Sequence, residues 1–103
     1  MTAPVQRGQV YRADLGYGPK PWLVVSNNGR NRVLSEIVAV RITTTVRDLP
    51  TWVPLGSVDP LVGNVNADCI EQLHKEELAE LLGSLSRPTM RRVDHALRLA
   101  LAL

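Results

Sequence analysis

At 103 residues, with 45% hydrophobic and 21% charged residues, the chain has the size and composition of one globular domain, which we expect to span residues 1–103. No apolar run approaches the ~20 residues of a membrane span, and no basic region followed by an apolar stretch marks a signal peptide. The net charge of +2 by itself excludes no partner. A single cysteine, Cys69, excludes an internal disulfide and fits the reducing cytoplasm, where we expect the protein.

The first half of the chain predicts three β-strands after a loose tail. The tail covers residues 1–6, and the strands are expected at residues 9–15, 21–25 and 36–44. Gly16 to Pro19 form the first turn, since two glycines permit positive φ and the proline blocks continuation of the strand. The unbroken apolar run from Trp22 predicts a central strand with Trp22 in the core. Asn27 to Arg32 is a loop by composition.

The second half predicts two more strands, a helical turn and one long helix. They are expected at residues 51–55, 64–73, 74–82 and 86–101. Leucines at positions 78, 81 and 82 have helical spacing in the short turn. Ser86 is suited to N-cap the long helix, and Pro88 fits its first turn. Short strands, tight turns and a C-terminal helix indicate a mainly β fold, a small antiparallel SH3-like barrel.

Positive charge is concentrated in the first half of the chain. Seven cations lie there: Arg7, Arg12, Lys20, Arg30, Arg32, Arg41 and Arg47. Three acids oppose them: Asp14, Glu36 and Asp48. This imbalance is typical of a protein with a polyanionic partner. The alternative is a solvated cationic face without a ligand.

Residues that bind metals or support other common chemistries are not suitably spaced. His74 and His95 are far apart in sequence and lack a suitable ligand three or four residues away. The chain has no paired-carboxylate signal, no Gly-x-Ser-x-Gly motif and no Walker A loop. We therefore expect no metal and no cofactor, and we expect Cys69 to be a small buried apolar residue rather than a catalytic thiol.

Cations and hydroxyls near the ends of neighbouring strands suit the cleavage of RNA without a metal. This reaction needs a proton acceptor for the ribose 2′-hydroxyl, positive charge at the pentacoordinate phosphate and a donor for the leaving 5′-oxygen. Arg41 and Thr43 share one face at the end of the third strand, Thr44 follows, and Lys20 precedes the neighbouring strand. A guanidinium matches phosphate oxygens, and a threonine can donate to one. The simpler explanation of the threonine run is β-propensity.

Aromatic and amide side chains close to these loops can contact bases. Tyr17 and Trp52 can stack on them. Asn27 and Asn28 either read base edges or simply form the turn. With two arginines of the first half, the candidate RNA contacts are Arg12, Tyr17, Asn27, Asn28, Arg30 and Trp52.

Six short patterns occur along the chain in the order found in one known family. They are Arg-Gly-x-Val-Tyr, x-Pro-x-Leu-Val-Val-Ser-Asn, Val-x-Ile-Thr-Thr, Leu-Pro-Thr-x-Val, Val-Asn-Ala-Asp and Gly-Ser-Leu-Ser. Together they cover nearly the whole chain, which resembles the MazF/PemK family of toxins. The resemblance implies an endoribonuclease of a type II toxin–antitoxin system that cuts single-stranded RNA at short sequences without metal, leaving a 2′,3′-cyclic phosphate and a 5′-hydroxyl. It also implies a homodimer with an RNA groove across its interface, and a cognate antitoxin whose flexible acidic segment fills that groove.

The resemblance also assigns the catalytic residues. The family's catalytic arginine, which precedes a proline, falls on Lys20, and its catalytic threonine or serine falls on Thr43. Lysine departs from the pattern, because a point charge cannot form the bidentate phosphate clamp and a protonated amine is a poor base. Arg41 or Arg12 is the candidate to supply a guanidinium, and we expect Arg41 and Thr44 to stabilise the phosphate charge.

Two other functions compete with this one. A CcdB-like toxin resembles this fold but poisons DNA gyrase with a C-terminal tryptophan, whereas this chain ends in Leu101-Ala102-Leu103. A non-catalytic SH3-like binding module is the second alternative. Cleavage of RNA in the presence of a chelator distinguishes the ribonuclease from both.

Overall fold

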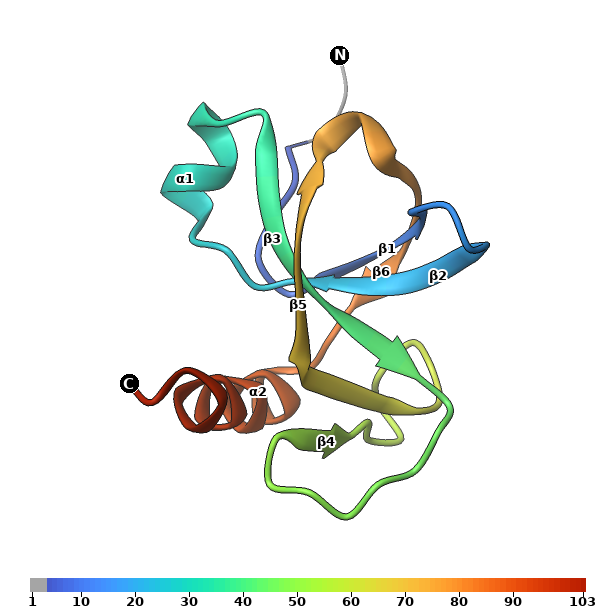
Figure 1. Cartoon of the computed structure of the whole chain (residues 1–103), viewed down its shortest axis with the longest axis vertical. Coiled ribbons are helices and arrows are strands. Elements are labelled where there is room, and N and C mark those ends of the chain that lie inside the picture. Colours follow the sequence, from blue (N-terminus) through green and yellow to red (C-terminus); the bar gives the residue numbers. More distant parts are fainter. Residues whose placement is uncertain (1–3) are drawn as a thin grey trace.

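The computed structural model describes residues 4–103, so Met1 to Ala3 of the expected tail lie outside the described residues. Figure 1 shows a bent sheet with the C-terminal helix beside the bend and a short helix toward the opposite end of the molecule. The elements in chain order are β1 (Gln9–Asp14), β2 (Pro19–Val24), α1 (Asn28–Val33), β3 (Glu36–Thr43), β4 (Trp52–Pro54), β5 (Asn64–His74), the 3-10 helix η1 (Lys75–Glu77), β6 (Leu78–Ser84) and α2 (Arg87–Leu101).

The strands form one antiparallel sheet in the order β4-β5-β3-β2-β1-β6. The predicted mainly β class with a C-terminal helix is confirmed. The predicted barrel is only partly realised, because within residues 4–103 the two edge strands, β4 and β6, do not pair with each other. In the same part of the chain no helix has the length and hydrophobicity to cross a membrane.

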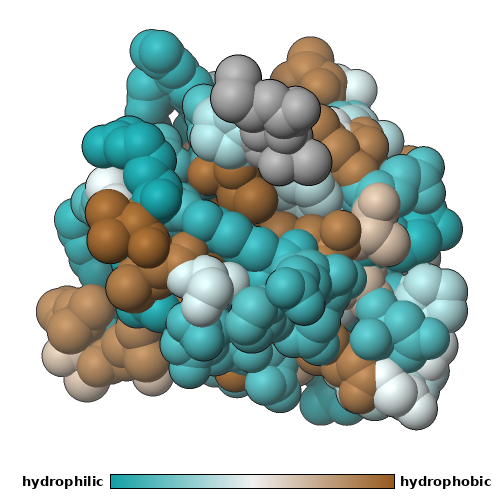
Figure 2. All heavy atoms as spheres, turned by 90° about the horizontal axis from the view of Figure 1, so that it is seen from above, coloured by the Kyte–Doolittle hydropathy of each residue, from teal (hydrophilic) through white to brown (hydrophobic). Residues whose placement is uncertain are grey.

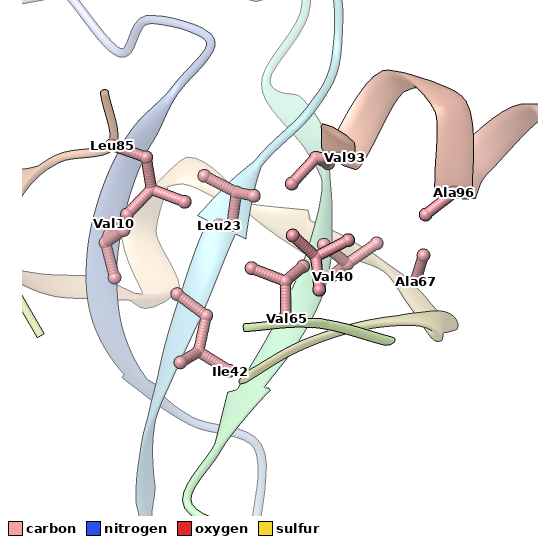
Figure 3. Close-up of a cluster of buried hydrophobic side chains, with 10 residues drawn as sticks. Val10, Leu23, Val40, Ile42, Val65, Ala67, Leu85, Val93 and Ala96 are labelled. Atoms are coloured by element: carbon pink, nitrogen blue, oxygen red, sulfur yellow. The ribbon is translucent and has the colours of Figure 1, made fainter. Parts of the chain in front are cut away.

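The sheet has a hydrophobic core on each face. The core under α2 contains Val10, Leu23, Val40, Ile42, Val53, Val65, Ala67, Leu85, Val93 and Ala96, most of which Figure 3 labels. The core on the other face contains Ala13, Trp22, Val24, Ile37, Ala39 and Leu73. Side chains of β2 alternate between the two cores, and Trp22 has no exposed surface. The prediction of a central, doubly buried second strand is therefore confirmed.

Strand β5 bends sharply where its pairing with β3 slips. Val40 pairs with Ile70, but the next residue, Arg41, pairs with Asn66, so residues 67–69 have no partner on β3. A bulge of this kind bends the bulged strand and increases its twist. The bend is visible in the lower half of β5 in Figure 1. It turns the first residues of β5 toward β4, which pairs with residues 64–66.

The segment expected to be a helical turn at residues 74–82 forms η1 and then strand β6, so this prediction was wrong. The Glu77 carboxylate accepts the backbone N–H of His74 at 2.8 Å, which closes a single 3-10 turn. From Leu78 onward the chain pairs with β1. Long-range pairing therefore overrides the leucine spacing, which is too short a pattern to distinguish helix from strand.

The loop expected at residues 27–32 contains the short helix α1, so this prediction was also wrong. The side chain of Asn27 caps it, because its Oδ1 accepts the backbone N–H of Gly29 at 2.7 Å. Asn31 is almost fully buried and donates through Nδ2 to the carbonyl oxygen of Ser26 at 2.9 Å. Asparagine thus begins the helix and also fixes it to the end of β2.

The N-terminus of α2 agrees with its prediction, since Ser86 is the N-cap and Pro88 lies in the first turn. Asp59, in the loop before β5, holds this end of the helix. Its Oδ1 accepts the N–H of Ser86 at 2.8 Å, and its Oδ2 accepts the Thr89 hydroxyl at 2.7 Å and the N–H of Gly56 at 2.6 Å. Burial tends to raise the pKa of Asp59, but these hydrogen bonds outweigh it and lower the pKa below its usual value.

Replacing Asp59 with Ala should lower the free energy of unfolding by about 2 kcal/mol, because three donors lose a charged acceptor. Folding lowers the pKa of Asp59. The contribution of Asp59 to the free energy of unfolding is therefore complete above the pKa of the unfolded state, about 3.9, and is lost as the pH falls through the pKa of the folded state. Urea unfolding between pH 3 and 7 measures both effects. Asp48→Ala, at an exposed site, is the control. Equal losses in the two variants at pH 7 would contradict the role of Asp59.

Candidate active site

Strands β2 and β3 bring the predicted catalytic residues together. In their antiparallel register Trp22 is opposite Arg41. Lys20 lies two residues before Trp22 and Thr43 lies two residues after Arg41, so the same register sets Lys20 opposite Thr43. Because side chains alternate, all four lie on one face of the sheet.

Lys20, Arg41 and Thr43 line a single pocket of about 450 Å³, whereas Trp22 is buried in the core. Its lining comprises Pro19, Lys20, Pro21, Arg41, Ile42, Thr43, Thr44, Thr45 and Val62. We call it the rim pocket. All four residues that we predicted to be catalytic from the sequence are therefore found in one place, and Thr45 and Val62 are lining residues that the sequence analysis did not identify.

The charged side chains of the rim pocket are both cations. The ion pairs among residues 4–103 join Arg7 to Asp94 and Arg12 to Glu80, so in this part of the chain neither Lys20 nor Arg41 is paired with a carboxylate. The Nε atom of Arg41 is buried and has no hydrogen-bond partner among the described residues. Two uncompensated positive charges in one partly buried pocket favour an anionic ligand.

The Thr43 hydroxyl is held so that its proton is free to donate. Its Oγ1 accepts the backbone N–H of Thr45 at 3.2 Å. The carbonyl oxygen of Thr45 in turn accepts Nδ2 of Asn64 at 3.1 Å. Gly63 packs directly beneath this segment, since a Cβ at Gly63 would lie 2.6 Å from the Thr43 carbonyl oxygen. The sequence offered no signal for the contacts that Asn64 and Gly63 make with this segment, because these two contacts depend on the pairing of β3 with β5.

Trp52 lies beside the rim pocket. It lines a neighbouring hollow of about 430 Å³ that shares Thr45 with the rim pocket. The Arg47 guanidinium lies over its ring, 5.7 Å from the centroid. Tyr17, in the turn before β2, is 56% exposed and close in sequence to Lys20. Both aromatic side chains thus remain available for stacking on bases.

The other candidate RNA contacts lie elsewhere. Asn27, Asn28 and Arg30 belong to α1 and its cap, beside the start of β3, whereas the rim pocket lies at the end of β3 (Figure 1). Figure 2, which views the molecule from above, shows hydrophilic and hydrophobic patches side by side on this surface. The Oδ1 atom of Asn28 accepts the backbone N–H of Arg7 at 2.7 Å. These asparagines therefore have structural partners, and any contact with RNA at this end stays a prediction.

Arg12 does not line the rim pocket. It pairs with Pro21 in the β1–β2 register, whereas its neighbour Ala13 pairs with Lys20. Alternation therefore directs Arg12 to the opposite face of the sheet from Lys20. There its Nε lies 3.7 Å from a carboxylate oxygen of Glu80. Of the two arginines considered, Arg41 is the one that the fold brings to Lys20 and Thr43.

Cys69 lies at the bend of β5 and is half-buried. Burial raises the pKa of its thiol, the nearby charge of Glu71 raises it further, and the charge of Arg41 opposes them. A thiol with a raised pKa is a weak nucleophile at neutral pH. The expectation that Cys69 is not catalytic fits this environment.

Comparison with known proteins identifies the family. The family model of PemK-like, MazF-like toxins of type II toxin–antitoxin systems matches residues 6–101. The chain belongs to this family. Endoribonuclease MazF4 of Mycobacterium tuberculosis is 59% identical over 100% of this chain and 97% of its own length.

Solved structures agree with this assignment. An endoribonuclease in complex with its cognate antitoxin, from a mycobacterial species, superposes with a TM-score of 0.95 at 59% identity and covers 98% of this chain and 97% of its own. A MazE–MazF structure from Deinococcus radiodurans has a TM-score of 0.86 at 23% identity, covers 99% of both chains and shows the shared fold alone.

Replacing Gly63 with Ala should destabilise the protein more than replacing Gly18 with Ala. Both glycines have positive φ, +141° and +100°, so both substitutions strain the backbone. Only at Gly63 does the new Cβ also meet a backbone atom, the Thr43 carbonyl oxygen. We expect an additional loss of about 2 kcal/mol in urea unfolding. Equal losses would show that Gly63 is not packed against Thr43.

Proposed function

We propose that this MazF-like toxin is a metal-independent endoribonuclease that cuts single-stranded RNA at a short sequence. The observation that carries the proposal is the convergence of Lys20, Arg41, Thr43 and Thr44 in the rim pocket, with no carboxylate among its lining residues. Positive charges and hydroxyl donors without a nearby carboxylate suit the phosphodiester of an RNA strand. The 59% identical endoribonuclease of M. tuberculosis, which spans the whole chain, supports the same activity.

In this proposal the ribose 2′-oxygen attacks the adjacent phosphorus and loses its proton, while the bond from phosphorus to the 5′-oxygen breaks. The products are a 2′,3′-cyclic phosphate and a 5′-hydroxyl, whose oxygen takes up one proton. Lys20 and Thr43 act directly on the reacting phosphate, and Thr43 donates to a non-bridging oxygen. Arg41 and Thr44 stabilise the additional negative charge of the pentacoordinate state.

We propose that bases next to the cut stack on Trp52, which lies beside the rim pocket, and on the exposed Tyr17 in the turn before β2. A stacked base contributes about 1–3 kcal/mol to the binding of a single strand. Arg12, Asn27, Asn28 and Arg30 lie away from the rim pocket, so any role for them is in binding RNA beyond the reacting phosphate.

The proposal includes the partners expected for this family. A single domain acts in the cytoplasm as a homodimer, and a cognate antitoxin with a flexible acidic segment neutralises it. A cationic pocket that attracts RNA phosphates also attracts carboxylates, so one pocket serves both ligands. Support comes from the mycobacterial endoribonuclease whose structure contains its cognate antitoxin.

Lys20→Ala and Thr43→Ala should each reduce cleavage of a single-stranded RNA by at least a hundredfold, because each removes an interaction with the transition state. The assay contains EDTA, and the products are tested for the cyclic phosphate. Lys75→Ala is the matched control, since Lys75 is also partly buried but belongs to η1. Its rate should equal that of the wild type.

Full activity of both variants would refute this site. Intact RNA in every reaction, together with inhibition of DNA gyrase by the wild-type protein, would instead support the gyrase poison. Loss of activity should occur without loss of fold, so the melting temperature of each variant is measured in parallel.

A further inference from the structure

We infer that Asn64 is a positioning residue for Thr43, which it controls through the turn at residues 43–45. The inference rests on the proposed role of Thr43 in RNA cleavage. Asn64 is the first residue of β5, and its side chain is one of the few buried polar groups, with 7% exposure. It does not line the rim pocket, so any effect on the reaction must pass through its neighbours.

The connection from Asn64 to the hydroxyl consists of two hydrogen bonds. The Nδ2 of Asn64 donates to the carbonyl oxygen of Thr45 at 3.1 Å. The N–H of the same Thr45 donates to Oγ1 of Thr43 at 3.2 Å. Asn64 thus fixes the peptide that orients the Thr43 hydroxyl. With Oγ1 accepting from Thr45, the hydroxyl proton is the part of Thr43 left to donate to a phosphate oxygen.

Strand pairing and the contacts of neighbouring residues fix the position of Asn64, so it can act as a rigid support. It pairs directly with Thr43 in the β3–β5 register. The preceding residue, Gly63, lies so close to the Thr43 carbonyl that a Cβ would meet it at 2.6 Å. The carbonyl oxygen of Gly63 accepts the N–H of Leu55 at 2.9 Å, which closes the base of the loop, and Asp59 ties the loop to α2.

The Thr43–Thr45 segment has few other supports. Only Thr43, the last residue of β3, belongs to a strand, and Thr44 and Thr45 are exposed. Without the amide of Asn64, the Thr45 carbonyl can rotate and release the hydroxyl of Thr43. A misplacement of about 1 Å in a reacting group can lower a rate about a hundredfold. Asn64 should therefore affect the chemical step more than RNA binding.

The test replaces Asn64 with Ala and measures kcat and KM for a short single-stranded RNA. We expect kcat to fall about ten- to hundredfold, with KM changed less than threefold. Asn31→Ala is the matched control, because Asn31 is a buried asparagine whose Nδ2 also donates to a backbone carbonyl, that of Ser26, far from the rim pocket. Asn31→Ala should lower the melting temperature by about as much as Asn64→Ala does, while its kcat stays within twofold of the wild type.

A double-mutant cycle with Thr43→Ala shows whether Asn64 acts through Thr43. Single-turnover reactions with protein in excess make slow cleavage measurable. If Asn64 positions Thr43, then Asn64→Ala should cost less than threefold once Thr43 is already Ala. Independent, multiplicative losses, or an unchanged kcat in Asn64→Ala, would overturn the inference while leaving the proposed function intact. If Thr43→Ala itself is fully active, the proposed role of Thr43 fails, and this inference fails with it.

Discussion

The antiparallel pairing of β2 with β3 fixes where the candidate catalytic side chains lie. Setting Trp22 opposite Arg41 forces Lys20 to stand opposite Thr43 on the same face. A shift of one residue would send every side chain of the shifted strand to the other face and separate the amine from the hydroxyl. The buried Trp22 side chain prevents such a shift, because it would have to leave the core.

The two cores make the pairing of β2 with β3 rigid. The start of β2 and the end of β3 extend beyond the cores and line the rim pocket. β2 lies in the middle of the sheet, between β1 and β3, and is buried on both faces. The first residues of β2 line the polar rim pocket rather than a core. The bulge in β5 lets that strand follow β3 and then turn to β4, so that Asn64 reaches the Thr43–Thr45 turn. Stability and the candidate site thus share the same strand pairings.

Local patterns in the sequence were sufficient for part of this structure. Alternation placed Arg41 and Thr43 on one face, and the apolar run around Trp22 identified the central strand. The leucines of residues 78–82 were misassigned because partial burial in an edge strand gives no clear period, and pairing with β1 decides the outcome. The contacts of Gly63 and Asn64 with the Thr43–Thr45 turn could not be predicted from the sequence, since they depend on a register between strands far apart in sequence. Interactions between strands, rather than local propensity, build that part of the site.

The proposed site is best tested by a crystal structure of the protein with a short RNA that carries a 2′-deoxyribose at the cleavage position and therefore cannot be cut. We expect the scissile phosphate to lie in the rim pocket, with one oxygen within hydrogen-bond distance of the Thr43 hydroxyl and another near the amine of Lys20. A scissile phosphate bound outside this pocket, with Lys20 and Thr43 both free of contact, would contradict it.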